Sequence, residues 1–534
     1  MQRYIILFFL FCSLILTSCT VRENTTGYEV QLEEKPETLS VYVNGNRTRS
    51  LEGEEYYFNF VSVGPSGPLA CGVHEEGHIL YDALHAFEEE SGIELEITYF
   101  EFPEDMELQL KEDRENHTEP DVVLWDNRRW GGKVGTIDDE NMFRLIADDW
   151  FYDLTDYMDS DGIYDSGEYY NEVLRAGRWK DRQYVVPFLF NMDALYSSKE
   201  DLQYMGCQLN PSMTAAELLG QLMNGLDQMQ DGDVVLDSMT TLGGLHYICG
   251  MFWRSMAGGV VDYTQEAVNL DLDFFETYAT FYRRLIEKDA PGAIKILQER
   301  KRAGEEIADV GLQADSSVMQ DRCIVSIDPE EIKDWFRAGG IHMENAGDPL
   351  IYHSFIGQAM FLNSIYQDLG EEMVMSAVPQ WENANAYTAW VHTTGAVMEG
   401  SRYPYAGYQL LHFLMDQEYE ALYTISVNRG ATQRMLDTLS ETEYTLYVGA
   451  AFAWGDVDLD KVATYEIRPL PGELREQIEY ILDHIGAMVL IEDSIQRIPR
   501  EHLLAYVMGE ETVEEAYEGT VRGIQENIRY LVGE

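Results

Sequence analysis

Tryptophan and arginine side chains follow an apolar run in the stretch PDVVLWDNRRWGG, from Pro120 to Gly132. The run reads as a buried strand, with Trp125 at its end and Arg129 and Trp130 just beyond it. Sugars present an apolar C–H face and a belt of hydroxyls, which stacked aromatic rings and planar charged groups bind well. We therefore predict a sugar-type ligand at Trp125, Arg129 and Trp130, with a core or rim position of either tryptophan as the alternative.

Catalytic motifs are absent from the sequence. It contains no G-x-S-x-G elbow, H-E-x-x-H pair, Walker A loop or G-x-G-x-x-G after a strand. Acidic residues are abundant, but nothing identifies two held at the separation that glycoside hydrolysis requires. Asp456–Asp460 begins like a calcium loop, yet Lys461 stands where glycine is needed. We expect no enzyme, no cofactor and no bound metal, and keep an extracellular carbohydrate-active enzyme as the alternative.

The charge balance limits the classes of molecule that the protein can bind. The 534 residues include 37 basic and 95 acidic side chains, a formal net charge of −58, which would repel nucleic acid. Hydrophobic residues make up 45% and aromatics 12%, enough for folded cores in a chain long enough for at least two domains. We expect a globular monomer that binds a small molecule and no nucleic acid.

The N-terminus predicts export. Arg3 precedes an apolar run from Tyr4 to Leu16 that is too short for a comfortable membrane span but fits a signal-peptide core. Leu16-Thr17-Ser18-Cys19 looks like a bacterial lipobox, so residues 1–18 should be removed and Cys19 lipidated, and the polar stretch 19–54 should act as a tether. An uncleaved anchor is the alternative.

The four remaining cysteines do not settle a redox state. Their wide spacing matches no metal-binding pattern, and they could form disulfides or stay as buried thiols. They are Cys71, Cys207, Cys249 and Cys323.

A βαβ unit opens the folded part. Strands are predicted at Tyr57–Val63 and Ile93–Phe100, with a helix from Ile79 to Gly92 between them. This order predicts a parallel sheet that binds ligands at the carboxyl ends of its strands. Further strands are predicted at 120–125, 183–190, 323–327, 374–379 and 394–398, and helices from the Thr214 capping box and at 273–288, 403–416 and 512–531.

The order of these landmarks resembles the family 1 extracellular solute-binding proteins, the group that includes maltose-binding protein, over essentially all of the mature chain. Each motif is weak by itself, and the specificity lies in their sequence with the lipobox. They are Pro120-Asp121-Val122-Val123, Asp153-Leu154-Thr155-Asp156-Tyr157, Leu195-Tyr196-Ser197-Ser198-Lys199, and Tyr506-Val507-Met508-Gly509 before Glu511-Thr512-Val513-Glu514-Glu515-Ala516.

The resemblance implies an α/β, two-lobed periplasmic-binding-protein-like fold, with discontinuous lobes, a hinge and a ligand cleft between them. Lobe one would comprise residues 55–185 and 374–435, and lobe two residues 186–373 and 436–534. It also implies an extracytoplasmic lipoprotein that delivers a sugar or oligosaccharide to the permease of an ABC importer. A ligand-binding sensor co-receptor remains a second alternative.

The same resemblance supplies further candidate ligand contacts. The sugar-contacting positions of maltose-binding protein fall on Trp125, Arg128 and Arg129. Arg128 is basic where that protein is acidic, which argues against maltose but leaves a sugar or an acidic sugar. Other candidates come from segments that the family places at the cleft, and each has a solvated loop residue as its alternative. They are Asn191, Asp193, Asp328, Trp390, His392 and Thr393.

Overall fold

The computed structural model describes the segments that carry the fold. These are residues 35–44, 61–64, 67–70, 80–100, 103–126, 139–210, 212–230, 234–236, 252–262, 265–289, 292–304, 349–356, 373–381, 386–419, 425–441, 444–448, 463–489 and 497–532. The predicted strand at 323–327 and the cysteines at 71, 249 and 323 lie outside them, and Cys207 is a buried free thiol.

The first strand of the main sheet lies where the sequence predicted a tether. β1 (Thr38–Asn44) pairs in parallel with β4 (Glu94–Phe100) on one side and β5 (Val122–Asp126) on the other. The structure therefore corrects the tether assignment over these residues. Alternation explains the strand, because every second side chain is aliphatic and fully buried, namely Leu39, Val41 and Val43.

The predicted first strand, Tyr57–Val63, has a different place. β2 (Val61–Gly64) forms a hairpin with β3 (Gly67–Ala70) and also pairs with β16 (Tyr444–Val448). With β17 (Ala463–Ile467), these strands make a separate antiparallel sheet in the order β17-β16-β2-β3. The parallel βαβ unit is instead β1, α2 (Tyr81–Ser91) and β4, with α2 ending at Gly92 in the left-handed conformation (φ 64°).

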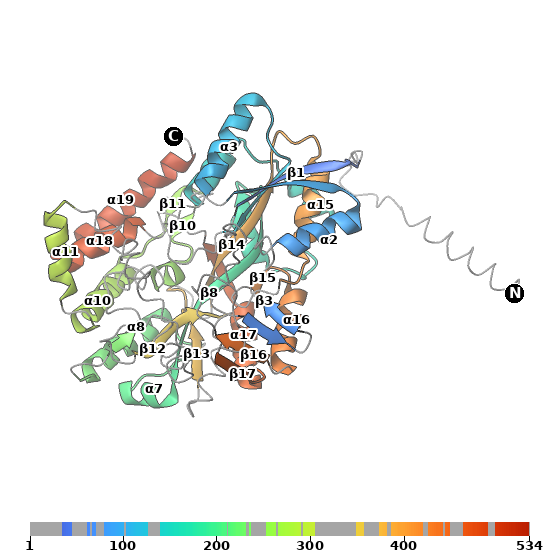
Figure 1. Ribbon diagram of the computed structural model, residues 1–534. Coiled ribbons are helices and arrows are strands. Elements are labelled where there is room, and N and C mark those ends of the chain that lie inside the picture. Colours follow the sequence, from blue (N-terminus) through green and yellow to red (C-terminus); the bar gives the residue numbers. More distant parts are fainter. Residues whose placement is uncertain are drawn as a thin grey trace, which may run out of the picture.

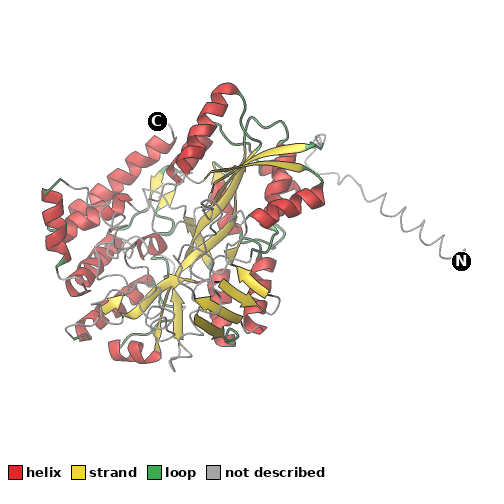
Figure 2. Cartoon of the chain, viewed as in Figure 1, coloured by secondary structure: helices red, strands yellow, loops and turns green. Residues whose placement is uncertain are grey.

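Ten of the described strands form one mixed sheet through the middle of the molecule (Figure 1). Its path runs β4-β1-β5-β14-β8-β12-β9, so two long neighbours, β14 (Tyr387–Val397) and β8 (Val185–Ser198), occupy its centre. The other members are β9 (Val234–Leu236), β12 (Pro349–Phe355), β13 (Met373–Ala377) and β15 (Ile425–Ser426), with β18 (Ile485–Val489) beside β14. Figure 2 shows helices gathered on either side of the strands.

Two hydrophobic clusters divide the described interior, and each has its own helices. We call them the first and the second cluster. Helices of the first cluster are α2, α3 (Pro103–Asn116), α4 (Asp139–Ala147), α5 (Thr155–Ser160), α6 (Asn171–Leu174), α15 (Pro404–Met415), α16 (Arg429–Glu441) and α17 (Gly472–Asp483). Those of the second are α7 (Lys199–Met205), α8 (Ala215–Gln228), α10 (Leu272–Asp289), α11 (Ala293–Arg302), α18 (Arg497–Val507) and α19 (Val513–Val532).

The clusters do not follow the expected lobe boundaries everywhere. The buried hydrophobic residues described between Leu436 and Ile485 pack in the first cluster, although lobe two was expected to resume at 436. Only from Ile498 onward does the described chain return to the second cluster, and Leu531 at the end of α19 packs in the first. Pairing decides this, because β18 is hydrogen-bonded to β14. The lobe boundaries stay a prediction.

Several predicted helices are confirmed at their starts. Thr214 and Glu217 form the reciprocal capping box at α8, and Thr512 and Glu515 form the same pair of bonds at α19. The long aromatic helix predicted at 273–288 is α10. Short elements complete the fold: β6 (Arg178–Trp179), β7 (Arg182–Gln183), β10 (Val261–Asp262), β11 (Ala267–Val268) and the 3₁₀ turn Arg175–Gly177.

Candidate ligand site between two cores

The two clusters meet along β8, all of whose side chains are buried. Ala194 and Tyr196 belong to the first cluster, whereas Leu195 between them belongs to the second. Successive side chains of a strand point to opposite faces, so Asp193 shares the face of Leu195. The polar residues on this boundary are called the seam here, and they are Asn191, Asp193, Arg254, Ser255, Thr388 and Trp390.

A buried ion pair forms the centre of the seam. Arg254, in the helical segment 252–256, donates from Nε to Asp193 Oδ2 at 2.8 Å and from its terminal nitrogen to Oδ1. Ser255 Oγ donates to the same Oδ2 at 2.7 Å. Asp193 is 2% exposed and Arg254 8%. The two parallel bonds fix the plane of the guanidinium group.

The ion pair supports an aromatic ring on the neighbouring strand. Arg254 Cζ lies 4.7 Å from the centre of the Trp390 ring, within range of a cation–π contact. Ala389 and Val391 pack in the first cluster, while half-buried Trp390 packs against the second. Thr388 Oγ1 donates to the Ser255 carbonyl at 2.8 Å, which ties β14 to the same helical segment. The seam thus holds a partly exposed indole in a fixed frame.

Three of the sequence-predicted contacts lie together on this seam. Asn191 and Asp193 come from β8 and Trp390 from β14, just beyond the Phe190–Val391 pair where the pairing of the two strands ends. Arg254 links Asp193 to the Trp390 ring. Asn191 is buried and its Oδ1 accepts the Met192 backbone N–H at 3.0 Å. Their role as ligand contacts stays a prediction, but the Asp193 carboxylate is already hydrogen-bonded to Arg254 and Ser255.

Trp125 lies elsewhere, inside the first cluster. Only 3% of it is exposed, and its ring meets Phe151 edge-on with centroids 5.6 Å apart. Its indole nitrogen has no hydrogen-bond partner among the residues that the structure describes. This is the environment of a core tryptophan, the alternative that the sequence left open. Ligand contact by Trp125 stays a prediction.

The other predicted site residues lie mostly outside the described part of the chain. Arg128, Arg129, Trp130, Asp328 and Cys19 lie outside the described residues. His392 is a member of β14, and its side chain is not described, while Thr393 in the same strand is fully buried. In the described segments, no group of three histidine, cysteine or acidic side chains is placed to hold a metal ion.

Sequence reasoning missed Arg254 and Ser255, although a signal was present. Arg254 stands in the run FWRSMA, whose other large side chains are apolar. An arginine in a buried segment needs a carboxylate partner, because an unpaired charge there is very costly. Its partner, Asp193, is far away in the sequence, so only the fold could pair them.

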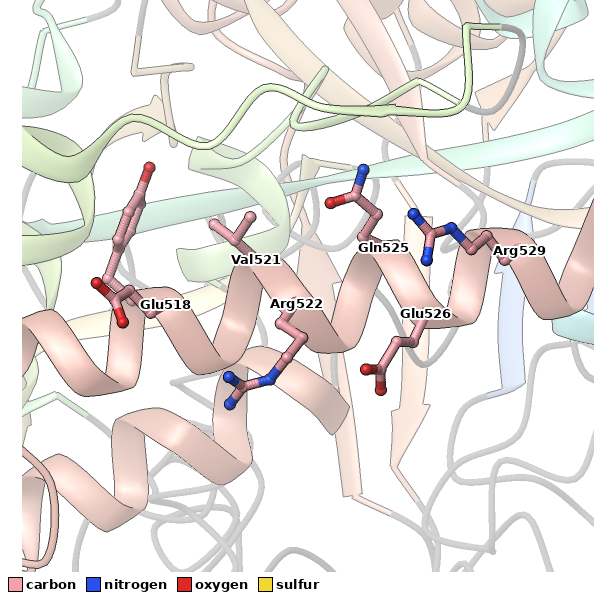
Figure 3. A pocket seen from close by; sticks show the side chains of 7 residues that line it. Glu518, Val521, Arg522, Gln525, Glu526 and Arg529 are labelled. Carbon is pink, nitrogen blue, oxygen red and sulfur yellow. The ribbon is translucent and has the colours of Figure 1, made fainter.

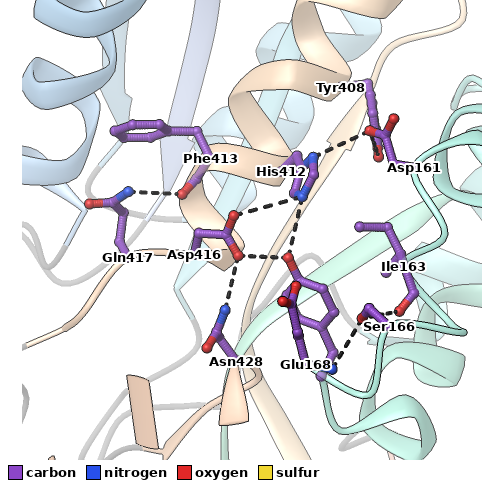
Figure 4. A network of polar contacts seen from close by, with 11 residues as sticks. Asp161, Ile163, Ser166, Glu168, Tyr408, His412, Phe413, Asp416, Gln417 and Asn428 are labelled. Atoms are coloured by element: carbon purple, nitrogen blue, oxygen red, sulfur yellow. Dashed lines mark hydrogen bonds and ion pairs between the residues drawn. The ribbon is translucent and has the colours of Figure 1, made fainter. Parts of the chain in front are cut away.

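A second polar cluster lies beside residues of the first hydrophobic cluster (Figure 4). His412 on α15 stands between Asp161 (3.4 Å) and Asp416 (3.7 Å), and Tyr408 and Tyr169 donate to these carboxylates. The hydrogen bond with Asp161 raises the pKa of His412 despite its burial. Burial disfavours ionisation of Asp161, but the bonds from His412 and Tyr408 hold its pKa below the usual value. We call this group the His412 network.

A pocket on α19 is built by one helix alone. Charged and polar side chains dominate its lining, which comprises Tyr517, Glu518, Val521, Arg522, Gln525, Glu526 and Arg529 (Figure 3). It therefore lies on a helix surface, not on the seam. No helix in the described segments has the length and apolar character to cross a bilayer.

Solved structures share this architecture. An extracellular solute-binding protein family 1 member from Alicyclobacillus acidocaldarius superposes with a TM-score of 0.51 at 12% identity, over 93% of this chain and 100% of its own. The galacto-N-biose-/lacto-N-biose I-binding protein of an ABC transporter from Bifidobacterium longum superposes with a TM-score of 0.51 at 11% identity, over 94% of this chain and 99% of its own. A sugar transporter protein from Rhizobium etli, in an open conformation, superposes with a TM-score of 0.50 at 10% identity, over 91% of this chain and 99% of its own.

This chain has the solute-binding-protein fold. The predicted two-lobed α/β architecture and the resemblance inferred from the sequence are confirmed at the level of the fold. No family model matches the sequence, and no curated protein matches it either. β8 and β14, which carry four of the six seam residues, are the central neighbours of the main sheet.

Proposed function

We propose that this protein is the extracytoplasmic solute-binding component of an ABC importer, and that it holds a carbohydrate at the seam. The observation that carries the proposal is the half-buried Trp390 ring, fixed by a buried ion pair where the two clusters meet. Similarity in fold to a lacto-N-biose-binding protein of an ABC transporter and to a sugar transporter protein supports it. The proposal assigns no catalysis to this chain.

The chemistry of the seam suits a sugar ring. An indole face is flat, apolar and rigid, and it stacks on the C–H face of a pyranose. Thr388 and Asn191, on the strands around Trp390, belong to the buried polar groups of the seam. A ligand that touches both clusters would favour the closed arrangement through its differential affinity, and the closed surface is what a permease would recognise.

A ligand screen tests the proposal. Thermal unfolding of the mature chain would be followed with neutral and acidic mono- and oligosaccharides, oligopeptides and polyamines. We expect a carbohydrate to raise the melting temperature, because binding to the folded state stabilises it by mass action. Stabilisation by peptides or polyamines alone, or turnover of a glycan during incubation, would contradict it.

Closure gives a second test of the same function. Scattering at saturating concentration of the best sugar should show a smaller radius of gyration than the free protein, because β8 and β14 link the two clusters as hinge strands. An unchanged radius with proven binding would argue for a rigid carbohydrate-binding protein outside a transport cycle.

The proposed function includes a lipid anchor at Cys19. The apolar run that ends in Leu16-Thr17-Ser18-Cys19 supports it. Cys19→Ser should move the protein from the membrane fraction to the medium or periplasm in the native type of host, whereas Cys12→Ser should not. Normal processing and membrane retention of Cys19→Ser would rule out lipid at this position.

A further inference from the structure

The charge of the seam indicates which sugars it accepts. Resting on the function proposed above, we propose that the Arg254–Asp193 pair positions Trp390 without adding net charge, so that the site selects an uncharged sugar over its acidic counterpart. Neither residue needs to touch the ligand for this. Arg254 acts through the ring that it supports, and Asp193 acts through Arg254.

Geometry supports the positioning role. Two hydrogen bonds from Arg254 and one from Ser255 occupy the Asp193 carboxylate, so the guanidinium plane cannot swing away from the Trp390 ring. The ring centre lies 4.7 Å from Arg254 Cζ. A supported ring loses little conformational entropy when a sugar stacks on it, and this preorganisation increases affinity.

Charge supports the selectivity. A guanidinium keeps its proton at physiological pH, so Arg254 alone would attract an anion. Asp193 sits at hydrogen-bond distance and cancels that charge. A uronate placed near the pair would lose hydration without gaining a net attraction. The chain as a whole carries a formal net charge of −58, which repels it. A neutral pyranose has no such penalty.

A series of charge variants tests the inference. The probes are glucose with glucuronate, galactose with galacturonate, and the best neutral sugar of the screen with the same sugar oxidised to its uronate. The measured quantity is the Kd of the acid divided by the Kd of the neutral sugar. Arg254→Gln leaves a local charge of −1, Asp193→Asn leaves +1, and the double variant restores zero.

The expected order follows charge. The Kd ratio should exceed 1 in the wild type, rise in Arg254→Gln, fall by roughly tenfold in Asp193→Asn, and return to the wild-type value in the double variant. Glu418→Gln, in the exposed pair with Arg434, removes one negative charge as Asp193→Asn does, but away from the seam. It should leave the Kd ratio unchanged. A ratio that does not follow this order overturns the selectivity. If Asp193→Asn does not fold, Arg254→Gln and the double variant still give the step from −1 to zero.

The positioning role has a readout that needs no ligand. The near-ultraviolet circular dichroism band of Trp390 is the difference between the wild type and Trp390→Phe. It should weaken in Arg254→Gln and recover in part in Arg254→Lys, while the far-ultraviolet spectrum shows an intact fold. An unchanged band in Arg254→Gln overturns the positioning role. Wild-type protein that binds none of the sugars contradicts the proposed function instead, and the two failures are therefore distinct.

Discussion

Trp125 was predicted as a sugar-stacking residue and Trp390 as a candidate ligand contact, and the fold gives the two tryptophans different environments. Trp125 is the penultimate residue of β5 and lies within the first cluster, 3% exposed, with its ring edge-on to Phe151. Trp390 lies in β14, half-buried, with the Arg254 guanidinium over its ring. Both are strand residues, yet only one reaches the boundary between the clusters.

Strand alternation explains the difference. In β14, Ala389 and Val391 point into the first cluster, so Trp390 must point to the second. β5 is covered by the first cluster, which includes Val122, Val123 and Leu124 as well as Trp125. A tryptophan at a strand end is therefore a ligand platform only when its face of the sheet meets a boundary.

Truncation of Trp125 should have the largest effect. Trp125→Ala removes a buried aromatic side chain and should lower the free energy of unfolding by about 3–5 kcal/mol, because the surrounding core cannot collapse fully around the cavity. Urea denaturation measures this, and sugar affinity per folded molecule should stay unchanged. Stable protein with lost affinity would reverse the assignment and restore Trp125 to the site.

Truncation of Trp390 should act on binding instead. Trp390→Ala should weaken sugar affinity by about 1–3 kcal/mol, the scale of truncating a well-packed contact, with a smaller stability loss than Trp125→Ala. Calorimetric titration with the best sugar of the screen measures the change. Trp390→Phe keeps a ring and should retain more affinity than the alanine variant. Equal affinities of Trp390→Ala and wild type would remove Trp390 from the site.

Elements that depend on local patterns could be predicted from the sequence, whereas the pairing of strands that lie far apart in the sequence could not. The Thr214 capping box, the aromatic stripe of α10 and the apolar run of β5 each depend on residues close in sequence. β1 escaped prediction because seven residues amid a polar stretch look like tether until β4 and β5 are paired with them.

The candidate site shows the same limit. Asn191, Asp193 and Trp390 were predicted from segments that the resemblance places at a cleft. Arg254 links Asp193 to Trp390, and Asn191 lies just beyond the paired part of β8. Arg254 was not predicted, because its carboxylate partner is 61 positions away and no short motif links the two. Burial of Trp125 could not be predicted either, since a strand end looks alike in sequence whether it faces a core or a boundary.

The His412 network extends the contrast to charge. At the seam, the cation is an arginine whose charge does not change with pH, and both partners are deeply buried. In the His412 network, the cation is a histidine, 29% exposed, whose charge changes with pH. The seam pair should therefore hold its state through the neutral range, while the His412 network should not.

The smallest expected effect is the pH dependence of stability from His412. Because its folded-state pKa is raised, its contribution is fully present below the unfolded value of about 6.5 and is lost as pH rises through the folded pKa. Asp161 and Asp416 hold the protonated ring, with Glu168 adding attraction. The free energy of unfolding should fall above pH 6.5, and His412→Gln should flatten this part of the profile.

Asp161→Asn should flatten the profile in part, and the double variant should match His412→Gln, since both changes remove one shared interaction. Urea denaturation from pH 5.5 to 8.5 measures the slope. A slope retained in His412→Gln would assign it to another group, and a slope lost in Arg254→Gln would place the titration at the seam and break the contrast between the two regions.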